Sequence, residues 1–127
     1  MLKEITDTSI LSYDPTEGFL RVTVLPDKNL ELKEAKHDFD VAAKMLGYIR
    51  IAVLVDSRKA LQQSAEVRKF YASKEVAKTI TAMAILIDSS ATRLIANFFI
   101  QFSKPHFPTR LFNNTTAAEK WLKQFVK

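Results

Sequence analysis

The sequence predicts an α/β fold with a mostly parallel sheet, and three observations lead to this prediction. Two segments, Ile51–Val55 and Met83–Ile87, are apolar at every position, and an aspartate follows each of them. A strand without polar alternation is buried on both faces, as in the middle of a parallel sheet. Apolar residues at helical spacing lie between and beside these segments, so the strands are joined by helical crossovers.

Two further strands open the chain. They span Ser9 to Tyr13 and Phe19 to Leu25, and the five residues from Asp14 to Gly18 carry turn-forming residues at both ends. This pattern predicts an antiparallel hairpin. Apolar and polar residues alternate in the second strand, so we expect one buried face and one wetter face.

Two helices precede the second apolar strand. Lys33 to Leu46 has apolar residues at helical spacing and is followed by Gly47, which is typical of a helix end. A second helix is predicted from a cap at Ser64 to about Lys78, with its aromatic and branched side chains inward and its lysines outward.

The last third of the chain continues this alternation of helices and strands. A helix from about Ala91 to Phe102 has an unusually wide apolar face, which indicates deep burial or contact with a partner. After a loop with two prolines, Thr109 to Phe112 forms a short strand, and a capping box at Thr116 to Glu119 opens a final helix. The predicted order is therefore ββαβαβαβα, with the N-terminal strand antiparallel at one edge of the sheet.

Composition limits the classes of function. The chain has 127 residues, of which 47% are hydrophobic and 26% are charged, as expected for one globular domain over residues 1–127. Without cysteine and with two separated histidines, we expect no metal site and no thiol chemistry. Two glycines cannot build a phosphate-binding loop, and no nucleophile elbow is present, so we expect neither a cofactor nor an enzyme.

Charge and hydropathy suggest a location and exclude some partners. The formal net charge is +5, but the basic residues are scattered among acids, so we expect no nucleic acid partner. No apolar run approaches the roughly 18 residues that cross a bilayer, and the first residues lack the pattern of a secretory signal. The expected location is the cytoplasm.

The order of elements over nearly the whole chain is similar to the STAS domain of bacterial anti-sigma-factor antagonists, the SpoIIAA-like architecture, and to small STAS/SEC14-like proteins. The segments that carry the resemblance to an uncharacterised bacterial branch of that group are 53–58 (VLVDSR), 93–99 (RLIANFF) and 109–112 (TRLF) with Trp121-Leu122. The resemblance implies this fold and a regulatory, non-catalytic role in signalling.

One serine matches a position that matters in the antagonists. In those proteins a kinase phosphorylates a serine that follows the second βα strand, and here that position is Ser57, between Asp56 and Arg58. The second serine and the glycine of the family motif are missing. Ser89 and Ser90 resemble the motif in letters but fall one βα unit later, so the phosphorylated position does not transfer to them.

Polar residues follow the apolar strands, where an open parallel sheet usually binds ligands. We expect them to form one rim that binds an anion, a polar ligand or a partner's loop. The same residues also fit a structural role, in which the aspartates end strands and a serine caps a helix. The candidate rim residues are Asp56, Ser57, Arg58, Asp88, Ser89, Ser90 and Arg93.

The apolar helix offers a second candidate surface. Its phenylalanines fit an ordinary core, a small pocket for an apolar ligand or a lipid, or a face that is covered in a homodimer. The residues of this candidate apolar surface or pocket are Ile95, Phe98, Phe99, Phe102 and Phe107. The first hypothesis is therefore a non-enzymatic module that recognises a protein partner, and the alternative is a carrier of a small molecule or lipid.

Overall fold

The computed structural model describes residues 1–26, 28, 30–59, 65–88 and 106–126. Within them one mixed sheet has the strand order β1-β2-β3-β4-β5-β6, so spatial order follows chain order. The first three strands pair antiparallel, and β3 to β6 pair parallel. The strands are β1 (Leu2–Ile5), β2 (Ser9–Tyr13), β3 (Phe19–Val24), β4 (Ile51–Asp56), β5 (Ile80–Leu86) and β6 (Thr109–Phe112).

The predicted α/β class and the parallel pairing are confirmed. The two apolar segments are neighbouring strands, with Val53 opposite Met83 and Asp56 opposite Leu86. The strand β1 was not predicted. All four of its residues are exposed, so it carries no apolar pattern, and its pairing with β2 places it at the antiparallel edge.

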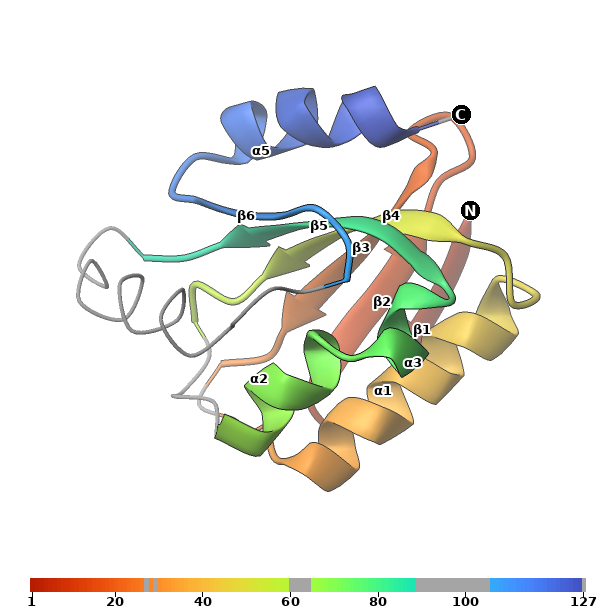
Figure 1. The fold of residues 1–127 in the computed structure, drawn as a ribbon, viewed down its shortest axis with the longest axis vertical. Coiled ribbons are helices and arrows are strands. Elements are labelled where there is room, and N and C mark those ends of the chain that lie inside the picture. Colours follow the sequence, from red (N-terminus) through yellow and green to blue (C-terminus); the bar gives the residue numbers. More distant parts are fainter. Residues whose placement is uncertain (27, 29, 60–64, 89–105, 127) are drawn as a thin grey trace.

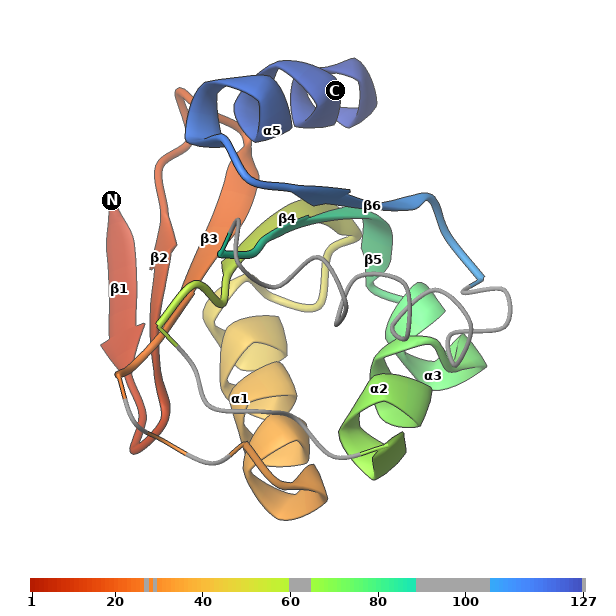
Figure 2. The ribbon, with the colours of Figure 1, turned by 90° about the vertical axis from the view of Figure 1, so that its left-hand side faces the viewer.

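Helices cover both faces of the sheet (Figures 1 and 2). The first face is covered by α1, α2 and α3, and the opposite face by α5. The helices are α1 (Leu32–Met45), α2 (Ala65–Tyr71), α3 (Lys74–Ala77) and α5 (Thr115–Leu122), which a short 3-10 turn, η2 (Lys123–Phe125), extends.

The unbroken apolar strands β4 and β5 contribute to two separate cores. Val53 and Met83 join the core beneath α1, whereas Leu54 and Leu86 join the core beneath α5. Burying each such large side chain contributes about 1.5–3 kcal/mol. Side chains of adjacent residues point to opposite faces, so a strand that is covered on both sides must be apolar throughout.

The predicted helix from Ser64 to Lys78 is wrong in one respect, because the described part of it forms two helices. The break lies at Ala72-Ser73, and the Ser73 hydroxyl accepts a hydrogen bond from the backbone N–H of Val76 at 3.4 Å. A serine that caps the following turn favours a new helix start over continuation. Ser64 lies outside the described residues.

The final helix also begins differently from the prediction. Asn114, not a Thr116–Glu119 capping box, caps α5, and its side chain accepts from the N–H of Ala117 at 2.9 Å. Glu119 instead forms an ion pair with Arg21 of β3, which links the hairpin to α5. Its charge is therefore used between elements and not at the helix end.

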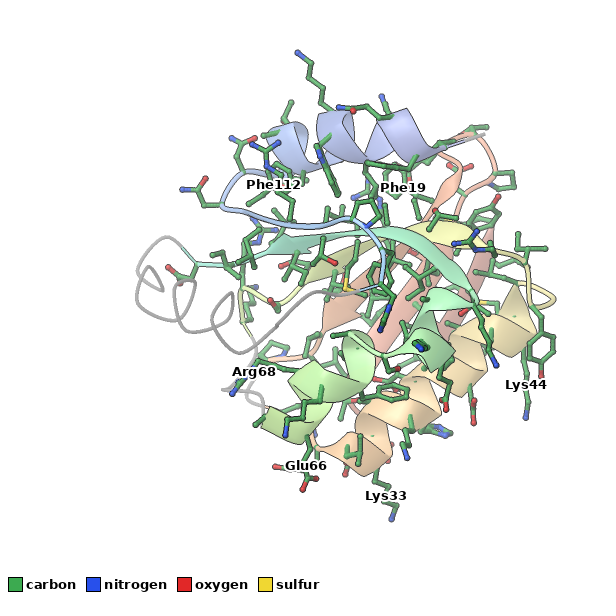
Figure 3. The ribbon with its side chains drawn as sticks, viewed as in Figure 1. Phe19, Lys33, Lys44, Glu66, Arg68 and Phe112 are labelled. Atoms are coloured by element: carbon green, nitrogen blue, oxygen red, sulfur yellow. The ribbon has the colours of Figure 1, made fainter. Side chains whose placement is uncertain are left out.

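Charged side chains cover the outer surfaces of the helices. Figure 3 shows Lys33, Lys44 and Glu66 pointing away from the sheet, whereas Phe19 and Phe112 lie between the sheet and α5. Lys33 and Lys44 of α1 and Glu66 of α2 thus lie on a solvated face.

Candidate functional site

The predicted rim forms where β4 ends beside β5. The backbone N–H of Ser57 donates to the carbonyl of Leu86 at 3.0 Å, and its hydroxyl donates to the same oxygen at 2.8 Å. Ser57 therefore fastens the end of one strand to the next. The structural role considered for a serine from the sequence was a helix cap, so this link between two strands was not predicted.

Arg58 is oriented by the aspartate at the end of β4. Its Nε and Nη2 atoms donate to the two carboxylate oxygens of Asp56 at 2.9 and 2.7 Å, and its backbone N–H donates to Oδ1 at 3.2 Å. The hydrogen bonds from Arg58 hold the pKa of Asp56 below its usual value. The arginine side chain stays 43% exposed, so this ion pair is a surface pair that contributes little to stability.

The structure brings together only part of the predicted rim. Asp56, Ser57 and Arg58 are adjacent, and Asp88 is an exposed residue beyond β5. Ser89, Ser90 and Arg93 lie outside the described residues. Asp56, Ser57 and Arg58 bond to one another or to the backbone, which weakens the case for a ligand site there.

A partly enclosed cavity lies between the sheet and α1. Its volume is about 60 Å³. The lining comes from the side chains of β2 to β5 that face α1, from α1 itself, and from the ends of α2 and α3. Its members are Ser9, Leu11, Leu20, Val22, Val24, Leu30, Asp38, Phe39, Ala42, Ala43, Leu46, Ile49, Ile51, Val53, Val55, Tyr71, Thr79, Ile80 and Met83.

One wall of this cavity carries a buried carboxylate. Asp38 on α1 is only 4% exposed, and its Oδ2 atom accepts hydrogen bonds from the hydroxyls of Thr8 at 2.8 Å and Ser9 at 2.9 Å. Its second oxygen, Oδ1, is buried without a hydrogen-bond partner in the described residues. A buried polar atom of this kind normally has a partner, so Oδ1 marks a position where one is missing.

Aromatic side chains form another part of the wall. The ring of Phe39 meets the edge of Phe70 at 5.7 Å between centroids, and Phe70 contacts Tyr71 at 5.5 Å. Burial raises the pKa of the Tyr71 hydroxyl, and the charge of Asp38 raises it further. The phenol is therefore neutral at physiological pH.

The cavity reaches the surface near the end of α1. Ile49 belongs to the lining and is 50% exposed. Gly47 and Tyr48, which precede it, both have positive φ angles of 68° and 62°. The left-handed turn after α1 thus places Ile49 at the open end, far along the helix from Asp38.

The predicted apolar pocket residues do not form this cavity within the described chain. Phe107 is buried in the core beneath α1 at 7% exposure and is not part of the lining. Ile95, Phe98, Phe99 and Phe102 lie outside the described residues. The pocket that the structure shows is instead built on the first helix.

Sequence reasoning did not single out Asp38, although a signal was present. In the predicted helix, Asp38 is three residues after Ala35 and four before Ala42, both of which are buried. This spacing places an acid on the apolar face of the helix. An acid at an inward position is rare enough to indicate a site.

The described residues form neither a metal site nor a membrane-spanning helix. Within the part of the chain that the structure describes, no three His, Cys, Asp or Glu side chains are grouped to hold an ion. Among the same residues, no helix has both the length and the apolar composition that crossing a bilayer requires.

Comparison with known proteins gives two matches. A family model described as a domain of unknown function (DUF7793) matches residues 13–126. The crystal structure of an uncharacterized protein from the DUF3478 family, with a SpoIIAA-like fold, from Shewanella loihica PV-4, is similar with a TM-score of 0.60 and 18% identity, covering 96% of each chain. No curated protein matches the chain. The resemblance to the STAS group is thus confirmed for the fold.

Proposed function

The chain belongs to the family described as a domain of unknown function (DUF7793), and we propose that it is a non-enzymatic binding module whose ligand site is the cavity beneath α1. The ligand is a small, mainly apolar molecule. Such a role corresponds to the carrier hypothesis, with the site beneath α1 and not beside the predicted helix at 91–102. We place this function in the cytoplasm.

The observation that carries the proposal is an unfilled apolar space with one buried polar end. Protein interiors are otherwise packed to crystal-like density, so an apolar cavity of about 60 Å³ is space that a ligand can fill. Placing an apolar molecule there removes its surface and that of the lining side chains from water, which is favourable. A bound molecule with a polar end would also give Asp38 a partner.

The size of the cavity favours a small molecule over a lipid. One water needs about 10–15 Å³ of such space, and an apolar cavity of about 150 Å³ accommodates benzene. The volume of about 60 Å³ lies between these values. By this comparison the cavity suits a ligand smaller than benzene and is too small for an acyl chain.

A binding role agrees better with the site chemistry than catalysis does. Asp38 and Tyr71 are the ionisable residues among those that line the cavity, and the phenol of Tyr71 is held neutral. General acid–base catalysis needs a group that is poised to exchange protons near neutral pH. The two histidines, His37 and His106, are exposed and do not line the cavity.

The exposed guanidinium of Arg58 favours a second candidate, the recognition of a protein partner. Asp56 holds it in one orientation at the end of β4, beside Ser57. An oriented arginine at an exposed edge suits a carboxylate or phosphate on a partner. Self-association through the segment 91–102, which the sequence predicts to be helical, remains a prediction, because those residues lie outside the described part of the chain.

Filling the cavity tests the proposed function. Ala42 lines the cavity from α1, so Ala42→Leu places a larger side chain in the ligand's space. The matched control is Ala117→Leu, at an exposed position of α5. We expect wild type and the control to bind isobutanol with a Kd on the order of millimolar, as suits five heavy atoms, and Ala42→Leu to bind none.

Binding is followed by NMR of ¹³C-labelled methionine methyl groups. Met83 lines the cavity, whereas Met1 is 83% exposed and serves as an internal reference. A titration that moves the Met83 signal in wild type and in the control, but not in Ala42→Leu, supports the proposal. Equal responses in all three proteins would refute it. A wild type that responds to neither isobutanol nor isobutylamine would also refute it.

A further inference from the structure

The buried acid at the wall of the cavity points to the chemical class of the ligand. We propose that the ligand is a small aliphatic amine, whose ammonium group binds Oδ1 of Asp38 and whose apolar body lies along β3 to β5. This inference rests on the proposed function, because it assigns the polar end of a ligand in the same cavity. It depends on the burial, the bonding and the surroundings of one carboxylate.

Asp38 lacks the partner that a buried acid normally has. It is 4% exposed, and within the described residues it forms no ion pair. Acids are almost never fully buried unless they are paired, since an unpaired charge in an apolar environment is strongly unfavourable. A cationic ligand supplies the missing charge.

The hydrogen bonds around Asp38 use one of its two carboxylate oxygens. The hydroxyls of Thr8 and Ser9, both at most 5% exposed, donate to the same oxygen, Oδ2. They leave Oδ1, which is buried without a partner in the described residues, as the atom that the ligand engages.

This arrangement distinguishes an ammonium from a guanidinium. A guanidinium binds a carboxylate best through two parallel hydrogen bonds, one to each oxygen. Here Oδ2 is already occupied by two hydroxyls, so Oδ1 alone is free to accept from a cation. An ammonium is a compact donor that needs one oxygen, and the carboxylate repels anionic ligands.

The remainder of the cavity defines the body of the ligand. The side chains opposite α1 are aliphatic, including Leu20, Val53 and Met83. They offer apolar contacts but no second acid. Apart from Asp38, the ionisable residue in the lining is Tyr71, whose phenol is neutral. A short branched amine with a single positive charge matches both ends of the cavity.

The test compares isobutylamine with isobutanol, which share a carbon skeleton and differ in the charged group. Wild type is titrated with each at neutral pH, and the Met83 methyl signal reports binding. We expect a Kd for the amine that is at least about tenfold lower than that for the alcohol, because the ammonium adds a charge-assisted hydrogen bond. Methylguanidine is expected to bind more weakly than isobutylamine.

Two variants locate the preference. Asp38→Asn keeps the shape of the side chain and removes its charge, so we expect the preference for the amine to disappear while the Kd for isobutanol changes by less than about twofold. Asp40→Asn removes the same charge from an exposed position of α1 and is expected to behave as wild type. A preference that survives Asp38→Asn would overturn the inference.

The outcomes separate the two proposals. If wild type binds isobutanol as tightly as isobutylamine, the cavity binds small molecules but the assignment of an amine is wrong. If neither compound moves the Met83 signal, the proposed function fails as well. The comparison within wild type decides the matter even if Asp38→Asn does not fold.

Discussion

Two glycines with the same backbone conformation but different surroundings give the sharpest test of the structure. Gly18, in the β2–β3 turn, has a φ of 79°, and Gly47, after α1, has a φ of 68°. A Cβ added at Gly18 would lie 2.4 Å from Cγ1 of Val126, whereas one added at Gly47 would meet nothing within 4 Å. We therefore compare Gly18→Ala with Gly47→Ala.

The expected losses follow from these two situations. A left-handed conformation costs an alanine roughly 1–2 kcal/mol at either position. Overlap with a packed side chain typically adds about 1–3 kcal/mol, and only Gly18→Ala has this second penalty. We expect the free energy of unfolding to fall by roughly 1–2 kcal/mol for Gly47→Ala and by roughly 2–5 kcal/mol for Gly18→Ala.

Urea unfolding measures both variants through the single tryptophan. Trp121 lies on α5 in the same core as Val126, so its fluorescence reports the region that Gly18→Ala disturbs. The double variant Gly18→Ala/Val126→Ala removes the overlap. We expect its loss of stability to be no larger than the conformational penalty at position 18 plus the loss of Val126 packing. Equal losses for the two single variants would show that Val126 does not contact this turn.

Three further predictions concern the core and the ionisable groups. Leu122→Ala empties a fully buried position on α5 and should lower the free energy of unfolding by about 2–5 kcal/mol in the same urea assay, and a loss below about 1 kcal/mol would contradict the packing. Arg58→Ala should leave stability at pH 7 almost unchanged, because the pair with Asp56 is exposed; the pair lowers the pKa of Asp56 in the folded state, so its small contribution is present at neutral pH and is lost as the pH falls through that lowered pKa. Wild type and Arg58→Ala should therefore converge in stability near pH 2, and a large loss at pH 7 would make Arg58 structural. Burial, and then the charge of Asp38, raises the pKa of Tyr71, so its contribution is complete below about pH 10 and is lost above it. Between pH 8 and 11 the melting temperature of Tyr71→Phe should therefore fall less than that of wild type. The difference should be modest because Tyr71 is partly exposed. Identical pH profiles of the two proteins would place Tyr71 in solvent.

The strands at the centre of the sheet were predictable because burial on both faces requires an apolar residue at every position. Every residue from Ile51 to Val55 had to be apolar, since α1 covers one side and α5 the other. The edge strand β1 has no such apolar pattern. Its residues are all exposed, and only its backbone pairing with β2 makes it a strand.

The rim and the cavity differ in how far the sequence could lead. The adjacency of Asp56, Ser57 and Arg58 follows from their position at the end of β4, so their place was predictable. What Ser57 does was not predictable, because its acceptor is a carbonyl oxygen 29 residues away, on β5. A serine after a strand has the same appearance whether it awaits a phosphate or fastens two strands.

The sequence by itself determined the α/β class, the parallel centre of the sheet and the helical faces, because these depend on the period of apolar residues along a short stretch of chain. The tertiary structure decided that Asp38 is buried, that Thr8 and Ser9 of the first hairpin bind one of its oxygens, and that Asp38 lines an apolar cavity. Ser9 and Thr8 precede Asp38 by 29 and 30 residues in the chain. Packing of α1 across the sheet brings them together, and local periodicity contains no information about which distant side chain will meet a buried charge.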